Sequence, residues 1–74
     1  MAPRLPNITA KEAVRAFLRA GFEHTGQRGS HARLRNPEGT HLIIPLHRGD
    51  IKRPLLKALI KQAGLSEFAF RQLL

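Results

Sequence analysis

The sequence predicts an α+β domain in which a helix, three antiparallel strands and a second helix follow one another, with both helices on one face of the sheet and a short helix at the C-terminus. Apolar residues recur at helical spacing near both ends of the chain, and they alternate with polar residues around a turn signal in its middle. A chain of 74 residues has enough apolar side chains for one two-layer core. Residues 1–74 are therefore predicted to form a single domain.

The first helix has clear start and stop signals. Residues 1–8 carry two prolines and are predicted to form an extended lead-in. Thr9 and Glu12 have the Thr-x-x-Glu spacing of a capping box, so the helix is expected to begin at Ala10. Gly21 is expected to end it. The side away from the apolar residues is basic, with Lys11, Arg15 and Arg19.

The middle of the chain is predicted to form the strands. Phe22 opens a first strand that runs to Arg28, and a hairpin follows from His31 to Pro45. The hairpin turn is indicated by Asn36-Pro37-Glu38-Gly39, which has proline at the second turn position and glycine where φ turns positive.

The hairpin register follows from burial. A turn with a bulge at its glycine pairs Leu34 with Leu42 and Ala32 with Ile44 on one face. A two-residue loop would instead place Leu34 opposite His41, so the bulged register is preferred. It leaves on the other face His31, Arg33, Arg35 and His41.

A loop over residues 46–52 is predicted to lead to the second helix, with Pro54 in its first turn and Gly64 at its end. One side of this helix carries cations at i, i+4 and i+8: Arg53, Lys57 and Lys61. Such a row is often only a solvated helix face. We favour phosphate contact here because the excess of positive charge over the whole chain also needs an explanation.

Ser66 is predicted to cap a last helix over residues 67–74, with Phe68 and Leu73 folded back on the core. The phenylalanines are assigned to the core rather than to base stacking: Phe17, Phe22, Phe68 and Phe70. With neither Trp nor Tyr, the chain lacks the aromatic platform that single-stranded nucleic acid usually needs.

The charge and composition of the chain limit the classes of partner that it can bind. Thirteen Lys and Arg residues against five Asp and Glu give a net charge of +8, which favours a polyanionic partner, nucleic acid before an anionic membrane surface. No apolar run approaches the roughly 20 residues of a membrane span, and the N-terminus lacks the apolar core of a secretory signal. We expect a soluble, cytoplasmic protein.

Neither a metal nor another cofactor is expected. The chain has no cysteine, and no two of its histidines stand at i and i+4 on a helix. Two of its five acidic residues already have cap or turn roles, so a cluster of carboxylates around magnesium is not expected.

His31 is the candidate catalytic residue. It follows Gly29 and Ser30 and precedes a strand that carries Arg33 and Arg35. An imidazole can accept a proton near neutral pH, while arginines hold a phosphate and oppose the negative charge of the transition state. The alternative that His31 only starts a strand stays open at this point. The remaining histidines are assigned to surface or turn positions: His24, His41 and His47.

Ser30 beside His31 also invites comparison with a serine hydrolase. Adjacent strand residues point to opposite faces, and no carboxylate is placed to orient the imidazole, so this class is disfavoured. The order of helices and strands is that of double-stranded-RNA-binding domains, although order alone is a weak signal of function.

Five segments of the sequence, in the same order and with compact spacing, closely resemble the HicA (YcfA-like) family of toxins from bacterial toxin–antitoxin pairs. The resemblance runs from about Ile8 to Leu74. The segments are Ala20-Gly21-Phe22-Glu23, Gln27-Arg28-Gly29-Ser30-His31, Asn36-Pro37-Glu38-Gly39, Ile44-Pro45-Leu46-His47 and Leu59-Ile60-Lys61-Gln62-Ala63-Gly64-Leu65-Ser66.

The resemblance implies a double-stranded-RNA-binding-domain-like fold and an mRNA interferase, an endoribonuclease that cleaves mRNA, inhibits translation and acts in stress responses. It also implies a HicB-type antitoxin that covers the active face, with no small-molecule ligand and no membrane partner. The catalytic histidine of the family falls on His31, and its Gly-Ser pair falls on Gly29 and Ser30. Many members have a second histidine or a bulky residue where this chain has Ala32, which the preferred register turns inward.

The resulting hypothesis is that neutral His31 takes the proton of a ribose 2′-OH, which attacks the adjacent phosphate. The groups expected to bind RNA are Arg28, Arg33, Arg35, Arg53, Lys57 and Lys61. No residue presents itself as the acid for the leaving oxygen, so water or protonated His31 remains available. A non-catalytic double-stranded-RNA-binding module and a small nucleoprotein or ribosome-associated component are the alternatives.

Overall fold

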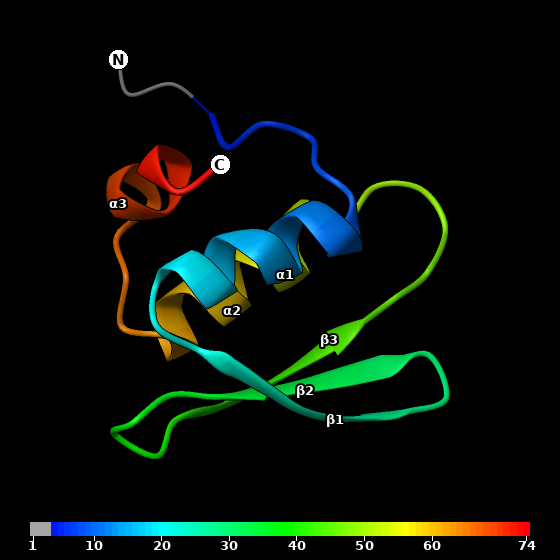
Figure 1. The fold of residues 1–74 in the computed structure, drawn as a ribbon. Coiled ribbons are helices and arrows are strands. Elements are labelled where there is room, and N and C mark those ends of the chain that lie inside the picture. The colour runs from blue at the N-terminus through cyan, green and yellow to red at the C-terminus, as the bar shows by residue number, and fades with distance from the viewer. Residues whose placement is uncertain (1–3) are drawn as a thin grey trace.

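The computed structural model describes residues 4–74 and confirms the predicted α+β class (Figure 1). The three strands form one antiparallel sheet in the order β1-β2-β3, and the long helices α1 and α2 lie on the same side of it. No helix of the described residues covers the other side. In chain order the elements are α1 (Ala10–Arg19), β1 (Glu23–Arg28), β2 (His31–Arg35), β3 (His41–Pro45), α2 (Arg53–Gln62) and α3 (Glu67–Gln72).

The predicted capping box starts α1. The Thr9 hydroxyl accepts a hydrogen bond from the backbone N–H of Glu12 at 3.2 Å, and the Glu12 carboxylate accepts one from the backbone N–H of Thr9 at 2.9 Å. The backbone N–H of Thr9, followed by its hydroxyl, holds the pKa of Glu12 below its ordinary value. The helix ends at Arg19, close to the expected glycine.

The bulged hairpin register is confirmed. Leu34 pairs with Leu42 and Ala32 pairs with Ile44, and all four side chains are buried. At the turn, the side-chain oxygen of Asn36 accepts a hydrogen bond from the backbone N–H of Thr40 at 2.7 Å. The hairpin side chains on the opposite surface, which we call the open face, are exposed at His31, Arg33, Arg35, His41 and Ile43.

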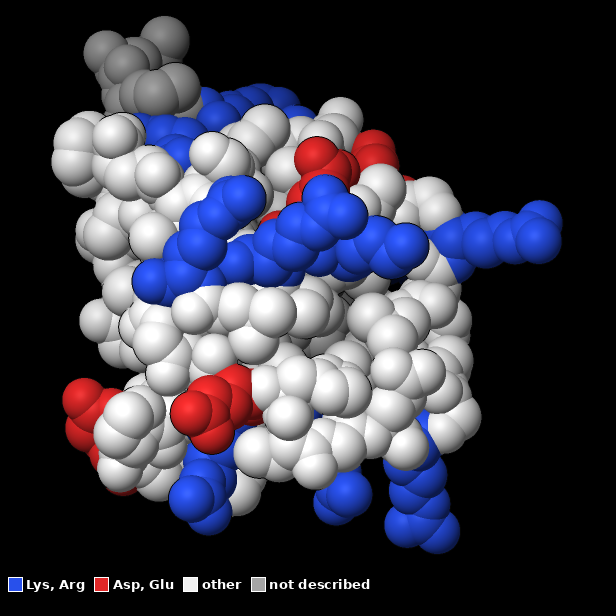
Figure 2. Space-filling model, in the orientation of Figure 1, with Lys and Arg blue, Asp and Glu red and all other residues white. Residues whose placement is uncertain are grey.

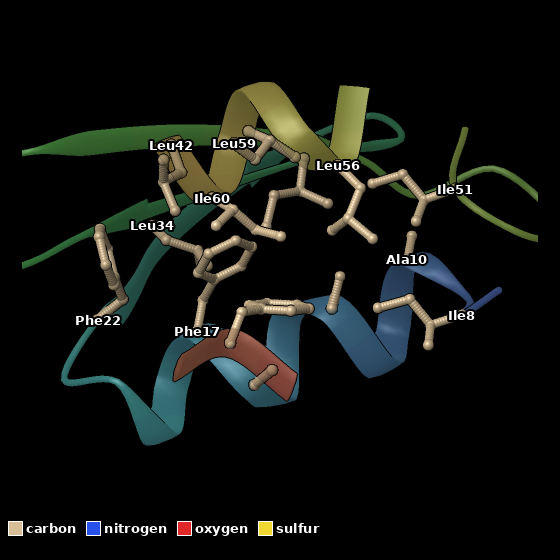
Figure 3. Close-up of a cluster of buried hydrophobic side chains, with 14 of the residues drawn as sticks. Ile8, Ala10, Phe17, Phe22, Leu34, Leu42, Ile51, Leu56, Leu59 and Ile60 are labelled. Carbon is tan, nitrogen blue, oxygen red and sulfur yellow. The ribbon is translucent and has the colours of Figure 1, made fainter. Parts of the chain in front are cut away.

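The core lies between the helices and the inner face of the sheet (Figure 3). Phe17 of α1 packs edge-on against Phe22, which immediately precedes β1, with 5.9 Å between the ring centroids. Side chains of α2 and the hairpin fill the space around these rings. The buried residues of α2 are Leu56, Leu59 and Ile60.

The extended lead-in is part of this core. Over residues 4–8 it has no helix or strand, as predicted, and the first three residues of that prediction lie outside the described part of the chain. Leu5 and Ile8 are nevertheless buried. The Ile8 carbonyl accepts a hydrogen bond from the N–H of Ile51 at 2.8 Å, so this segment ties the loop before α2 to the start of α1.

The last helix packs through only one of the two phenylalanines that were assigned to the core. Phe68 is 65% exposed, so its predicted core position is wrong, whereas Phe70 is fully buried with its ring centroid 5.0 Å from that of Phe17. Residues two apart on a helix point to nearly opposite sides, so only one of the two rings can face the core. Leu73, three residues after Phe70, packs against the core as predicted.

The ends of α2 and α3 are held by specific bonds. The Ser66 hydroxyl accepts from the N–H of Ala69 at 3.0 Å, which confirms the predicted cap, although α3 ends at Gln72. At the end of α2, the Gln62 amide donates to the carbonyl oxygen of His41 on β3 at 2.7 Å. Within residues 4–74, no helix combines the length and apolar character needed to cross a membrane.

Candidate active site

A two-residue turn places His31 at the start of β2. Gly29 and Ser30 connect β1 to β2, and Gly29 has a φ of +58°. A two-residue turn with glycine at its first position is typical of the type II′ hairpin, which matches the natural twist of paired strands. Within residues 4–74, no atom other than those of its chain neighbours lies within 4 Å of a Cβ built at Gly29, so the backbone conformation, rather than a lack of space, favours glycine there.

The strand pairing sets the surroundings of His31. Its partner on β1 is Arg28 and its partner on β3 is Pro45. Directly paired residues of antiparallel strands carry their side chains on the same face, so the Arg28 guanidinium belongs to the same surface as the exposed imidazole. The predicted combination of His31 with an arginine on the open face is therefore present.

The side chain of Arg33, which follows His31 by two residues on β2, lies over Gly26 of β1. Arg33 pairs with Gly26, beside a bulge that interrupts β1 between His24 and Gly26. A Cβ built at Gly26 would lie 3.0 Å from Nη2 of Arg33, so the glycine leaves the space in which this guanidinium sits. A side chain at position 26 would force Arg33 to move.

The open face carries arginines along β2, with one acidic residue at the end away from His31. Arg35 pairs with Glu23 on one side and His41 on the other, at the end of β2 away from His31. Glu23 is the only acidic residue in the three strands, so no carboxylate of the sheet lies next to His31. Figure 2 shows lysine and arginine side chains projecting from the sheet at the bottom of the view. This surface fits an anionic chain better than any uncharged partner.

The predicted basic row on α2 lies on a different surface. Lys57 and Lys61 are exposed, but α2 covers the face of the sheet opposite to His31 (Figure 1). Arg53 is partly buried, and its Nε donates to the Leu5 carbonyl at 3.2 Å. The structure therefore places Arg28 and Arg33 beside His31 and Arg35 farther along the same face, but the α2 row lies elsewhere.

A second band of positive charge runs over α1, clearly separate from the side chains below the sheet (Figure 2). It corresponds to the exposed cations of that helix, Lys11, Arg15 and Arg19. Lys11 also lines a groove of about 550 Å³ between the start of α1, β1 and the loop after β3. Val14, Ala32 and Leu46 form apolar parts of its wall, and Arg48 adds a second cation.

His47 lies between this groove and His31. It lines the groove, and its ring centroid lies 6.3 Å from that of His31 with an angle of 80° between the ring planes. The sequence predicts only a surface or turn position for His47 and does not indicate this proximity. Strand alternation could have indicated it. Pro45 is the partner of His31, and His47, two residues later, returns to the same face if the strand continues. Within residues 4–74, no three His, Asp or Glu side chains converge as metal ligands.

The comparison with protein families agrees with this architecture. The family described as the HicA toxin of bacterial toxin–antitoxin systems matches residues 10–65, which extend from the start of α1 to just beyond α2 and include the whole sheet and both histidines of the site. No curated protein gives a significant match. The chain belongs to the HicA toxin family, whose members pair with an antitoxin.

Proposed function

We propose that this toxin is a metal-independent endoribonuclease that cleaves mRNA and thereby inhibits translation. The observation that carries the proposal is the exposed imidazole of His31, paired with Arg28 on a sheet face that no helix covers. A long RNA strand can reach such a surface, whereas a buried histidine would be closed to it. In neutral form, His31 removes the proton of a ribose 2′-OH, whose oxygen then attacks the adjacent phosphorus.

The arginines of the open face bind the phosphates. Arg28 is the partner of His31 on β1, and Arg33 follows His31 by two residues on β2. Their positive charge offsets the negative charge that grows on the phosphate oxygens. Lys57 and Lys61 contact RNA only where the bound RNA chain extends beyond the open face and reaches α2. A HicB-type antitoxin that covers the open face would block the approach of RNA, and an acidic partner surface suits this role.

The test compares RNA with DNA of the same sequence, each with and without a chelator. The purified chain is expected to cleave RNA alone, to be insensitive to the chelator, and to leave a 2′,3′-cyclic phosphate and a 5′-OH, because DNA lacks the 2′-OH nucleophile. End-group analysis by mass spectrometry identifies the products. Intact RNA that is nevertheless bound by the chain would contradict the proposal and favour a non-catalytic RNA-binding module.

Removing one cation from the open face and one from α2 separates the roles of the two surfaces. Arg33→Ala is expected to slow RNA cleavage by about tenfold to a hundredfold, the range for loss of a charged hydrogen-bond donor to phosphate. The matched variant Lys61→Ala removes the same charge from α2. It is expected mainly to weaken binding and to flatten its dependence on salt by about one unit of slope. Equal losses of single-turnover rate in both variants would show that the open face has no special role.

A further inference from the structure

We infer that His47 is a second catalytic residue, which donates a proton to the 5′ oxygen that leaves when RNA is cleaved. This inference rests on the proposed function, and it supplies the acid for which the sequence suggested no residue. Its observation is separate from those that support His31 as the base: a second imidazole stands beside the first on the same exposed surface.

The spacing of the two rings suits one phosphate group between them. Their centroids are 6.3 Å apart and their planes are nearly perpendicular, which is too far for a hydrogen bond from ring to ring. Acid and base catalysts act over heavy-atom distances of about 2.6–3.2 Å, so each ring can reach one oxygen of a group held in the gap. The attacking 2′ oxygen and the leaving 5′ oxygen are on opposite sides of the phosphorus in such a displacement, as two separate catalysts require.

The backbone fixes His47 in this place. The N–H of Leu46 donates to the Ser30 carbonyl at 2.5 Å, which extends the pairing of β2 and β3 beyond the end of β3. Farther along the loop, Asp50 pairs with Thr9 as an isolated bridge. His47 is therefore held between two attachments, one to the hairpin turn and one to the start of α1.

Cations belong to both surfaces beside the pair, and the acidic Asp50 follows three residues after His47 in the same loop. Arg28 on β1 and Arg33 on β2 belong to the open face, while Lys11 on α1 and Arg48 in the loop line the groove with His47. The other titratable ring that lines the groove is His24. Among the described residues no acidic side chain lines the groove, so these cations are left to hold a phosphate beside the two rings.

The step balances with two histidines. Neutral His31 takes the proton from the 2′-OH as the bond from the 2′ oxygen to phosphorus forms. Protonated His47 gives its proton to the 5′ oxygen as the bond from phosphorus to that oxygen breaks. The products are a cyclic phosphate and a 5′-OH, with His31 protonated and His47 neutral, and exchange with water restores the starting states. Activity then requires one neutral and one protonated ring, so kcat/KM is expected to follow a bell-shaped pH profile.

The decisive experiment uses two short RNA substrates that differ in one atom, the bridging 5′ oxygen or a sulfur in its place. A thiolate leaves without a proton, because a thiol is a much stronger acid than an alcohol or water. His47→Ala and His47→Gln are expected to lose about 10²- to 10⁴-fold on the oxygen substrate and to cleave the sulfur substrate within about tenfold of the parent chain. His31→Ala is expected to remain slow on both.

The matched control is His41→Ala, which removes an exposed histidine from the open face at the other end of the hairpin. It is expected to behave like the parent chain on both substrates. In His47→Ala the alkaline side of the pH profile should also disappear. If the parent cleaves both substrates but His47→Ala is equally slow on both, or is not slow on either, the role of His47 is wrong and the proposed function stands. If the parent cleaves neither substrate, the proposed function falls, and the role of His47 with it.

Discussion

Replacing His31 with alanine is expected to lower the rate of RNA cleavage by about two to four orders of magnitude, the usual effect of losing a general base. The folded state should be little affected. The side chain is exposed, and within residues 4–74 it makes no hydrogen bond to the rest of the protein. Surface substitutions of this kind usually change the free energy of unfolding by less than about 0.5 kcal/mol.

Single-turnover cleavage and RNA affinity should be measured on the same preparation of His31→Ala. The affinity is expected to stay close to that of the parent, because the arginines that hold the phosphates are unchanged. A variant that cleaves at the parent rate would show that His31 is not the base. A variant that binds RNA as poorly as it cleaves it would show instead that His31 serves binding.

The largest effect on stability is expected from Phe70→Ala, which should lower the free energy of unfolding by about 3–5 kcal/mol. Phe70 is fully buried against Phe17 and anchors the short helix α3, which has few other large apolar side chains turned inward. For a domain of this size, each kcal/mol corresponds to about 4–8 °C in Tm. A fall of more than about 10 °C in thermal unfolding followed by circular dichroism is therefore expected.

Phe68→Ala is the control for that measurement, since it removes the same side chain from the same helix. The Phe68 ring is mostly exposed, with the Arg71 guanidinium 5.9 Å from its centroid. Its removal is expected to change the free energy of unfolding by less than about 1 kcal/mol. Similar losses in the two variants would mean that α3 is not held to the core through Phe70.

The elements of the fold follow from local signals in the sequence. The Thr9 and Glu12 pair marks the start of α1 because both partners of the capping box are only three residues apart. The hairpin register follows because only one register buries Leu34 against Leu42. The position of Phe68 does not follow in this way. The rotation of a six-residue helix is set by contacts with distant parts of the chain, which local spacing does not contain.

The same distinction applies to the site. The sequence placed His31 and Arg33 on one face, because strand alternation is a local rule. It did not place His47 beside His31, because a loop was expected from Leu46 onwards, whereas the hydrogen bond from Leu46 to Ser30 carries the strand alternation on to His47.

The carbonyl of His41 that receives the Gln62 amide bears on how other proteins can recognise this toxin. β3 is an outer strand, and it ends at Pro45, which has no N–H to offer. On the opposite margin of the sheet, β1 is interrupted by its bulge. Both margins are thus poor templates for a further strand, which discourages fibre-like stacking of copies. A neutralising protein must bind side chains rather than extend the sheet. Its dissociation rate is therefore expected to depend on ionic strength.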